Sequence, residues 1–332
     1  MANLYITEQQ SILRKTGDRL LVEKDGEIIL DVQCHKIDAV FIFGNVQFTT
    51  QAVHELFEHG IEMAIMTRRG RLIGQITSPA TKNIALRLAQ FRRFDEPAFR
   101  LALARSVISG KLKNCLALMK GFSANHPEIN IMEQMKALKI YSKSVPEAQS
   151  TEQLLGIEGS AARIYFKAMG SMILKNFVFT GRKKRPPPDP VNALLSFVYT
   201  MIFNEISSLL DGMGFDPYLG YLHKPDYGRP SLACDLIEEF RPLAGDRFVL
   251  NLVNRQVLTP NHFHAHSTGK GVYLTREGMK KFFREYERFH ARKFRHPDTG
   301  ETVTLRRCYR LQAEQMARCI KDGTPYHPML MR

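Results

Sequence analysis

The chain has 332 residues, of which 44% are hydrophobic and 24% charged, and it carries a formal net charge of +14. This composition is typical of a globular protein and excludes a disordered chain, and the longest nearly apolar run, residues 193–203, is too short to span a bilayer. The start, MANLYITEQQ, lacks the basic and apolar regions of a signal peptide.

The first part of the chain is predicted to be a small β-rich domain, residues 1–79. Six short segments are rich in β-branched or aromatic residues, as strands are: 4–7, 18–24, 27–33, 38–44, 61–67 and 71–77. Asp25-Gly26 is a hairpin turn signal between two of them, and Arg69-Gly70 is a weaker one. One helix is expected over roughly residues 50–59, ended by Gly60.

After the boundary near Ser78-Pro79, apolar residues recur at i, i+3 and i+4, which indicates helices, and almost no strand signal follows. The predicted fold class is therefore α+β, with the β-rich domain followed by a larger all-helical domain over residues 80–332. Five cysteines, at positions 34, 115, 234, 308 and 319, form no CxxC pair. This pattern predicts reduced thiols, a cytoplasmic location and no structural zinc.

The excess positive charge lies entirely in the second part of the chain. Residues 1–80 contain 8 basic and 10 acidic residues, a net charge of −2. The remaining 39 basic and 23 acidic residues give the second part a net charge of +16. An anionic partner, above all a nucleic acid, is expected to bind there.

The stretch LLGIEGSAARIYF, residues 154–166, places Glu158 at the start of an apolar-periodic helix. Two interpretations stay open. An acid at a helix N-terminus complements the helix dipole. Alternatively, Gly156 and Gly159 leave room for a backbone or a substrate to approach the carboxylate.

In the next stretch, GRKKRPPPDPVNALLSFVYTMIF, residues 181–203, the prolines impose an extended lead-in to a helix. Asp189 is predicted to cap that helix, with Pro190 as its first residue. The basic residues before the prolines are either ordinary solvated charge or a rigidly held grip for DNA phosphates. They are Arg182, Lys183, Lys184 and Arg185.

The stretch GYLHKPDYGRPSLACDLIEEFRP, residues 220–242, places His223 ahead of a predicted helix over Ser231–Phe240. At about 100° per residue, Asp235 and Glu238 are neighbours on one helix face, with Glu239 beside Asp235. Such a face is ordinarily solvated. A histidine together with carboxylates also suits a divalent cation, Mg²⁺ or Mn²⁺, with the imidazole favouring Mn²⁺.

Two further stretches, residues 262–266 and about 275–294, each allow a structural and a functional interpretation. HFHAH, residues 262–266, has alternating histidines that suit zinc on a strand, but its surroundings read as a loop, so a metal role is not expected. A helix over about residues 275–294 has a basic face that either is solvated or contacts nucleic acid. That face includes Arg284, Arg288 and Arg292.

Several of these blocks, in order, resemble the CRISPR-associated spacer-acquisition integrase, the universal endonuclease of the adaptation complex, and its type I-C branch in particular. The blocks are ARSVISGKLKNCLALM, LLGIEGSAARIYF, PPPDPVNALLSF, YLGYLHKPDYGRPSLACDLIEEFRP and QAEQMARCIKDGTPYHPM. They occur in the order found in the family and cover nearly the whole chain, so the resemblance is specific.

The resemblance implies an N-terminal domain used in homodimerisation and a helical catalytic domain that acts on double-stranded DNA, both the spacer precursor and the repeat. It implies Mg²⁺ or Mn²⁺ held by Glu158, His223 and Glu238, with Asp235 at a position where relatives also carry an acid. The longer side chain of Glu238 and its position after His223 favour it as the ligand, and Asp235 is expected to hold a ligand in place.

As partners, the resemblance implies the small ferredoxin-like protein of the same system, and it points to an iron-sulfur exonuclease as well. The implied reaction is attack of a DNA 3′-OH on a phosphodiester of the repeat, assisted by the metal. Two alternatives stay open: a basic DNA-binding module without catalysis, and a nuclease that only hydrolyses DNA. A binding module does not need Glu158, His223 and Glu238 to converge on one point.

Overall fold

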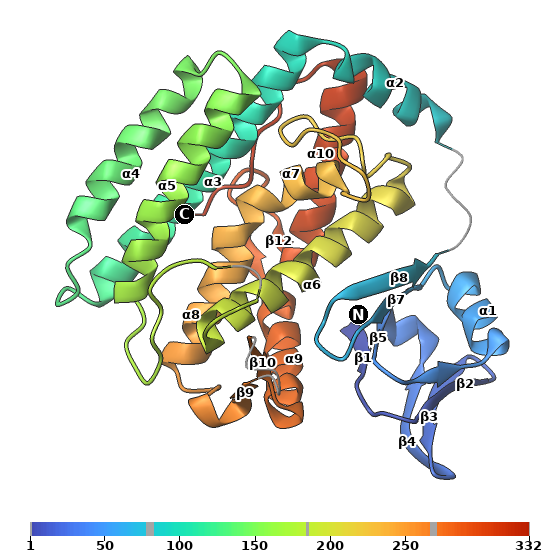
Figure 1. The fold of residues 1–332 in the computed structure, drawn as a ribbon. Helices are drawn as coiled ribbons and strands as arrows, with labels where there is room; N and C mark the ends of the chain where they lie inside the picture. The colour runs from blue at the N-terminus through green and yellow to red at the C-terminus, as the bar shows by residue number, and fades with distance from the viewer. Residues whose placement is uncertain (1, 78–82, 184–185, 266–270, 332) are drawn as a thin grey trace. The chain divides into compact units, whose positions relative to one another are not determined.

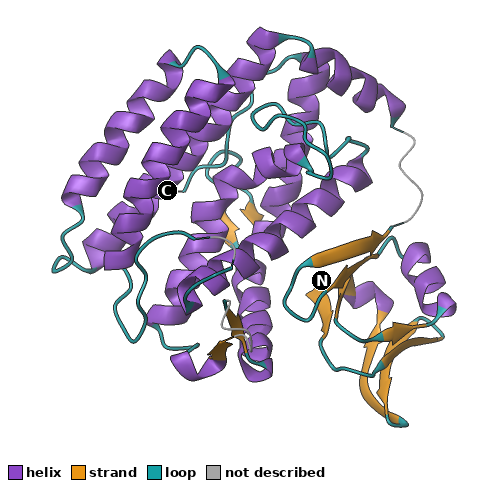
Figure 2. Ribbon diagram, viewed as in Figure 1, coloured by secondary structure: helices purple, strands orange, loops and turns teal. Residues whose placement is uncertain are grey.

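The computed structural model describes residues 2–77, 83–183, 186–265 and 271–331 (Figure 1). The chain divides into two compact units, Met1–Ala80 and Thr81–Arg332. Most of the strands belong to the first unit, and the second is built mainly of helices (Figure 2). The predicted α+β class is confirmed.

Two four-stranded sheets and one helix, α1 (Thr50–Glu58), form the first unit. One sheet has the order β1-β5-β7-β8, with β1 (Ala2–Ile6), β5 (Ile37–Phe43), β7 (Glu62–Met66) and β8 (Leu72–Ile76). The other has the order β4-β3-β2-β6, with β2 (Ile12–Thr16), β3 (Arg19–Lys24), β4 (Glu27–Gln33) and β6 (Gln47–Phe48). Between them lies a core of aliphatic side chains that includes Leu13, Val40, Leu56 and Met63.

Local sequence explains most of this unit. Asp25 and Gly26 have φ angles of 52° and 83°, as a tight hairpin turn requires, and β3 and β4 pair antiparallel across them as predicted. The side chain of Thr49 accepts a hydrogen bond from the amide of Ala52 and caps α1. The strands β2 and β6 were not predicted, because the second half of β2, from Arg14 to Thr16, is polar and exposed, and β6 has only two residues.

The second unit is a bundle of helices. In chain order these are α2 (Ile84–Phe94), α3 (Pro97–Asn125), α4 (Met132–Ser144), α5 (Thr151–Ser171), α6 (Pro190–Met213), α7 (Ser231–Phe240), the π-helix η3 (Arg241–Asp246), α8 (Arg247–Asn254), α9 (Arg276–Ala291) and α10 (Leu305–Asp322). The predicted start of α6 is confirmed, because the side chain of Asp189 caps it and Pro190 is its first residue.

Helix α6 is long and apolar enough, by length and composition, to cross a membrane, and it is the one such helix in the described part of the chain. The apolar run over residues 193–203 is too short to span a bilayer, but the whole of α6 is long enough. Its apolar side chains, among them Leu194, Val198 and Ile202, are buried within the bundle. They belong to the core of the second unit.

The second unit also contains two short antiparallel strand pairs that an all-helical domain would lack. They are β9 (Phe263–Ala265) with β10 (Val272–Leu274), and β11 (Phe294–Arg295) with β12 (Thr302–Val303). Strands of two or three residues have too few positions to show an alternating pattern. The loop predicted around HFHAH is therefore wrong at residues 263–265. His262 is buried and bonded to Thr259 and Lys281, and His266 lies outside the described residues.

His290 is a buried, neutral imidazole between α9 and α10. Its Nδ1–H donates to the carbonyl of Tyr286 at 2.9 Å, and its Nε2 accepts from the hydroxyl of Tyr309 at 2.9 Å. Burial lowers the pKa of His290 from its ordinary 6.5 to about 3. Above about pH 6.5 the ring is neutral in both the folded and the unfolded chain, so the stability does not depend on its protonation. As the pH falls from 6.5 towards 3, the unfolded chain takes up a proton that the folded chain does not, and the free energy of unfolding decreases.

We therefore expect His290 to reduce the free energy of unfolding by about 2 kcal/mol between pH 7 and pH 5. The variant His290→Gln keeps an acceptor for Tyr309 but gains no proton, so its stability is expected to fall less over the same interval. Urea unfolding of both proteins at the two pH values measures the difference. Equal pH dependence of the two proteins would contradict the assignment.

Candidate active site

The acids expected to bind a metal meet around the ammonium group of one lysine, Lys111 on α3. The ammonium pairs with the carboxylate of Glu158 on α5 and lies 2.6 Å from Oε2 of Glu238 on α7. Because one nitrogen touches both carboxylates, two acids that are far apart in the sequence lie side by side. The side chain of Lys111 is only 12% exposed, and the two negative charges hold its pKa above the ordinary value in spite of burial.

Glu158 lies in the middle of its helix. Helix α5 begins at Thr151 and is capped by Ser150, so the interpretation of Glu158 as an N-terminal acid is wrong. The first turn of α5 was not predicted because it is polar, and the apolar pattern of the helix begins only at Leu154. A Cβ atom placed on Gly156 or Gly159 would meet nothing within 4 Å, so the surface beside Glu158 is open.

The acidic face of α7 is buried, which makes the interpretation as a solvated face wrong. Asp235, Glu238 and Glu239 are 2%, 5% and 1% exposed. Burial opposes ionisation of Glu238, but the charges of Arg241 and Lys111 outweigh it and hold the pKa of this carboxyl well below its usual range. Nε of Arg241 donates to Oε1 of Glu238 at 3.1 Å. Glu238 is therefore a carboxylate at neutral pH.

Asp235 holds the loop that carries His223. Its carboxylate accepts hydrogen bonds from the amides of Tyr221, Leu222 and His223, at 2.6, 2.9 and 3.0 Å. Its Oδ1 also lies 2.7 Å from Nδ1 of the His223 ring. Because an ionised carboxylate only accepts, Nδ1 carries the proton and Nε2 keeps its lone pair. The loop can approach α7 this closely because a Cβ on Gly220 would lie 2.7 Å from the backbone of Ser231.

Glu239 points away from this site and anchors the C-terminal tail. It accepts hydrogen bonds from the hydroxyl of Tyr326 at 2.7 Å and the amide of Met329 at 2.8 Å. Burial raises the pKa of Glu239 to about 8, although these donors oppose the rise. Asn114 on α3 holds the same tail through the carbonyl of Met329 and the amide of Met331. The tail thus packs behind the turn of α3 that carries Lys111.

The donor set suits a divalent cation in two respects. Two carboxylates and one imidazole nitrogen are ligands for Mg²⁺ or Mn²⁺. Moreover, Oε2 of Glu238 is buried and accepts no hydrogen bond within the described chain, although it lies within ion-pair distance of Lys111. The three candidate ligand atoms do not all lie within 4.8 Å of one another, and the Lys111 ammonium contacts both carboxylates.

The candidate DNA-binding residues differ in exposure and in whether their side chains already have partners within the protein. The guanidinium of Arg182 donates to Asn192 at 3.0 Å and Ser196 at 3.1 Å, so it is used inside the fold. Lys183 is exposed, and Lys184 and Arg185 lie outside the described residues.

On α9, Arg284 and Arg288 both pair with Glu285, at 3.4 and 2.9 Å. Arg292 is exposed and forms no ion pair with any described residue. It lines a cavity of about 760 Å³ together with Arg247, Lys293 and Arg295. Burial and the charge of Arg292 lower the pKa of Arg247. Four basic side chains thus line the cavity, and Asp298 is the one acid among its lining residues.

Comparison with known proteins gives the family. Residues 4–288 match the family model described as CRISPR associated protein Cas1. The chain is 34% identical over 332 residues to the CRISPR-associated endonuclease Cas1 1 of Chlorobaculum tepidum, which covers 98% of this chain and 96% of that protein. It is also 34% identical over 337 residues to a CRISPR-associated exonuclease Cas4/endonuclease Cas1 fusion of Geobacter sulfurreducens, over 98% of this chain and 59% of the fusion.

Two solved structures share the fold. One is a casposase bound to its integration product, with a TM-score of 0.88 and 21% identity over 99% of this chain and 93% of the casposase. The other is a Cas6-RT-Cas1–Cas2 complex, with a TM-score of 0.83 and 24% identity over 100% of this chain and 36% of that one. Because residues 4–288 match the family model and a relative is 34% identical over 98% of the chain, this chain belongs to the Cas1 family.

Proposed function

We propose that this protein is the DNA endonuclease and integrase of CRISPR spacer acquisition, which inserts new spacer DNA by attack of a 3′-OH on a phosphodiester of the repeat. The observation that carries the proposal is the meeting of Glu158 and the buried Glu238 at the ammonium of Lys111, with His223 near enough to act on the charge of Glu238. A module that only binds DNA gains nothing from a buried carboxylate held beside a second acid and a histidine, since buried charge is costly. The type I-C branch stays a prediction from the sequence blocks.

We propose Mg²⁺ or Mn²⁺ as the cofactor, held by Glu158, Glu238 and Nε2 of His223. When bound, the ion neutralises charge at the reacting phosphate and activates the attacking hydroxyl. The protein prepares this site in two ways: Arg241 keeps Glu238 ionised, and Asp235 orients the imidazole of His223 with Nε2 free. With an ion bound by both carboxylates, Lys111 would give up at least one of its two contacts with Glu158 and Glu238.

The nucleophile decides between integration and simple hydrolysis. Neither reaction needs a nucleophile from the protein, so the same residues serve a DNA 3′-OH or water. A strand-transfer assay with a repeat-bearing plasmid separates the two, because only integration joins a labelled fragment to the plasmid and requires its 3′-OH. The relative named as an endonuclease and the casposase bound to an integration product favour a site with both activities.

We expect joining of a 3′-OH fragment, none with a 3′-deoxy end, and loss of the reaction on chelation while DNA binding persists. The assay is to be run with and without the small ferredoxin-like partner. Plasmid nicking without joining, in the presence of that partner, would favour the hydrolytic nuclease. Binding that is insensitive to metal and produces neither reaction would favour the module without catalysis.

We propose that double-stranded DNA, as spacer precursor and as repeat, contacts the second unit. The supporting observations are the net charge of +16 beyond residue 80 and the four basic side chains that line the cavity around Arg292 and Arg247. Lys183, Arg284 and Arg288 are further candidate phosphate contacts, as are Lys184 and Arg185 outside the described residues. Arg182 is better understood as a support for the lead-in to α6.

DNA affinity is expected to depend steeply on salt. If about six phosphates are neutralised, the logarithm of the binding constant falls with the logarithm of salt concentration with a slope near −5. The variant Arg292→Gln is expected to make this slope shallower by about 1. Arg307→Gln is the matched control, since Arg307 is already paired with Glu314. Fluorescence anisotropy at several salt concentrations measures both, and an unchanged slope for Arg292→Gln would remove it from the interface.

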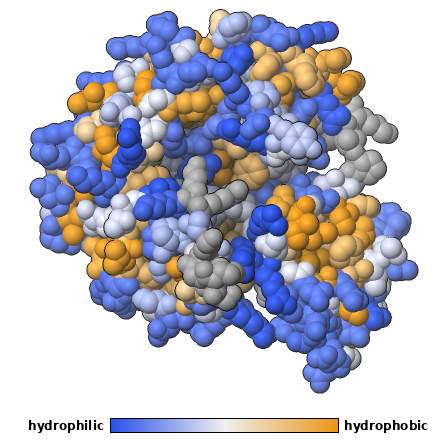
Figure 3. Space-filling view, in the orientation of Figure 1, coloured by the Kyte–Doolittle hydropathy of each residue, from blue (hydrophilic) through white to orange (hydrophobic). Residues whose placement is uncertain are grey.

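This chain works with other CRISPR adaptation proteins, and we propose three contacts. The first is homodimerisation through the N-terminal unit, whose edge strand β4 exposes Ile28, Ile29 and Leu30 at 60%, 47% and 37%. Figure 3 shows further apolar surface of this unit over β7 and β8, where Ile73 is 63% exposed. The second and third are the small ferredoxin-like partner and an iron-sulfur exonuclease, supported by the named complex and by the fusion relative.

We also propose a cytoplasmic location. The five cysteines are all free, and four of them are buried. Reduced thiols without disulfides are the usual state in the cytoplasm, where the DNA substrates also lie.

A further inference from the structure

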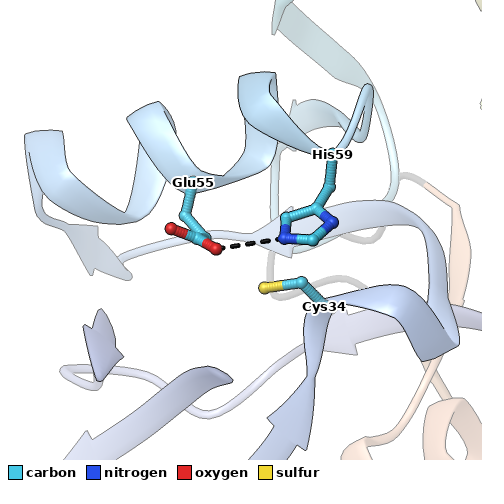
Figure 4. Close-up of side chains that lie close together, drawn as sticks. All are labelled: Cys34, Glu55 and His59. Carbon is cyan, nitrogen blue, oxygen red and sulfur yellow. Dashed lines mark hydrogen bonds and ion pairs between the residues drawn. The ribbon is translucent and has the colours of Figure 1, made fainter. Parts of the chain in front are cut away.

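Three side chains that commonly bind metals meet in the first unit, whereas the proposed active site belongs to the second. They are Cys34, Glu55 and His59 (Figure 4). Glu55 and His59 are one turn apart at the end of α1, and Cys34 opens the short 3₁₀ helix η1 (Cys34–Lys36) that follows β4. One ligand atom of each lies within 4.8 Å of the other two, and no other trio in the described part of the chain meets this condition.

Two of the candidate ligand atoms are bonded only to each other, and the third has no partner among the described residues. The ammonium of Lys15 pairs with Oε2 of Glu55, which leaves Oε1 facing the histidine, 3.1 Å from Nε2 of His59. The thiol of Cys34 is fully buried and has no hydrogen-bond partner among the described residues. The side chain of Glu55 is 8% exposed, whereas that of His59 is 35% exposed, so the cluster is closed on one side and open to water on the other.

We propose that Cys34, Glu55 and His59 bind one Zn²⁺ ion. A thiolate, an imidazole and a carboxylate together form a zinc donor set, whereas Mg²⁺ avoids sulfur. Tetrahedral zinc holds such ligand atoms roughly 3.4–3.6 Å apart, so the group reaches this geometry by small side-chain rotations. Water completes the coordination from the side of His59.

The chemistry of binding balances without any further reactant. The S–H bond of Cys34 breaks, the Zn–S bond forms, and the proton passes to solvent. In the metal-free protein Nε2 of His59 donates its hydrogen to Oε1 of Glu55. On zinc binding this proton would pass to solvent while Nδ1 takes one up, so that Nε2 binds through its lone pair and Oε1 of Glu55 exchanges its hydrogen bond for a bond to the ion. Lys15 stays on the other oxygen of Glu55, where it fixes the orientation of the carboxylate.

The spacing of the cysteines could not reveal this site, because it is assembled from two segments and contains one thiol. The ion would join the end of β4 to the end of α1. The inference is independent of the proposed function, since all three ligands belong to the first unit and Glu158, His223 and Glu238 to the second.

The test uses the full-length protein, stripped of metal and then titrated with Co²⁺ as a spectroscopic substitute for Zn²⁺. We expect a thiolate-to-cobalt charge-transfer band, which carboxylate and imidazole ligands alone do not produce. We expect Cys34→Ser to abolish the band and His59→Gln to weaken zinc binding by more than tenfold, measured by competition with a chromophoric chelator. His59→Gln is the safer variant for folding, since this side chain is partly exposed.

The matched control is His54→Gln. His54 lies on the same helix and pairs with Glu58 at i,i+4, as His59 pairs with Glu55, but no cysteine lies in its cluster. It is expected to leave both the band and the zinc affinity unchanged. Absence of a charge-transfer band in the unmodified protein overturns the proposal. So does a band that persists in Cys34→Ser, or a zinc affinity that His59→Gln and His54→Gln change equally.

Discussion

Glu238→Gln is expected to abolish both strand transfer and metal-dependent cleavage while DNA binding survives. The substitution keeps the shape of the side chain and removes one of the two carboxylate charges that meet around Lys111. It also leaves Arg241 and Lys111 without their shared counter-charge, so the site becomes more positive where a divalent cation has to bind. The basic surface is unchanged. Strand transfer and anisotropy at saturating Mn²⁺ measure the two effects on the same preparation.

Asp235→Asn provides the comparison, because Asp235 acts on the ion only through His223. The side-chain oxygen of the amide can replace only one of the two carboxylate oxygens, each of which accepts two hydrogen bonds, so the loop and the ring of His223 are held less firmly. A loss of about 10–100-fold is expected. Glu314→Gln on the exposed side of α10 controls for a general loss of negative charge. An active Glu238→Gln beside an inactive Asp235→Asn would reverse the two roles. Two fully active variants would remove α7 from the site.

Lys111→Met is expected to destabilise the metal-free protein by about 3–5 kcal/mol, the usual result of removing one partner from a buried ion pair. The two carboxylates of Glu158 and Glu238 then repel each other without a cation between them. A divalent cation can replace the lost ammonium, so Mn²⁺ is expected to raise the thermal unfolding temperature of this variant more than that of the unmodified protein. Differential scanning calorimetry with and without Mn²⁺ measures both quantities.

The control for this experiment is Lys113→Met, two residues further along α3, where the side chain is exposed. It is expected to change neither the stability nor the response to Mn²⁺. If Lys111→Met behaves in the same way, the ammonium does not occupy the cation position and the arrangement of the two acids needs another explanation. If the variant is destabilised but Mn²⁺ has no additional effect, Lys111 is a structural bridge only.

The elements and the two-part organisation could be read from the sequence because each depends on local patterns. The Asp25-Gly26 turn, the Asp189 cap and the bounds of α7 all follow from a few neighbouring residues. The metal-ligand candidates came from the resemblance to a family, and the spacing of residues alone left Asp235 and Glu238 open. Periodicity also suggested that the acids of α7 are solvated, since it cannot show which residues other helices cover.

Lys111 was missed for the same reason. A lysine in an apolar helix is ordinarily a side chain that reaches solvent along its stem, and only the packing of α3 against α5 and α7 shows that two acids surround it. The block ARSVISGKLKNCLALM held a signal in principle, because its apolar residues recur on every side of the lysine. The group of Cys34, Glu55 and His59 was missed because its members are separated by a strand and a loop.

The anchoring of the C-terminal tail has a consequence for the design of tagged and truncated variants. Tyr326 and Met329 supply donors to Glu239, the immediate neighbour of Glu238, and a Cβ on Gly110 beside Lys111 would lie 2.4 Å from Pro328. The tail therefore packs directly against the turns of α3 and α7 that carry Lys111 and Glu238. An affinity tag is therefore better placed at the N-terminus. Removing the last ten residues would remove the hydrogen bonds that Tyr326 and Met329 donate to Glu239.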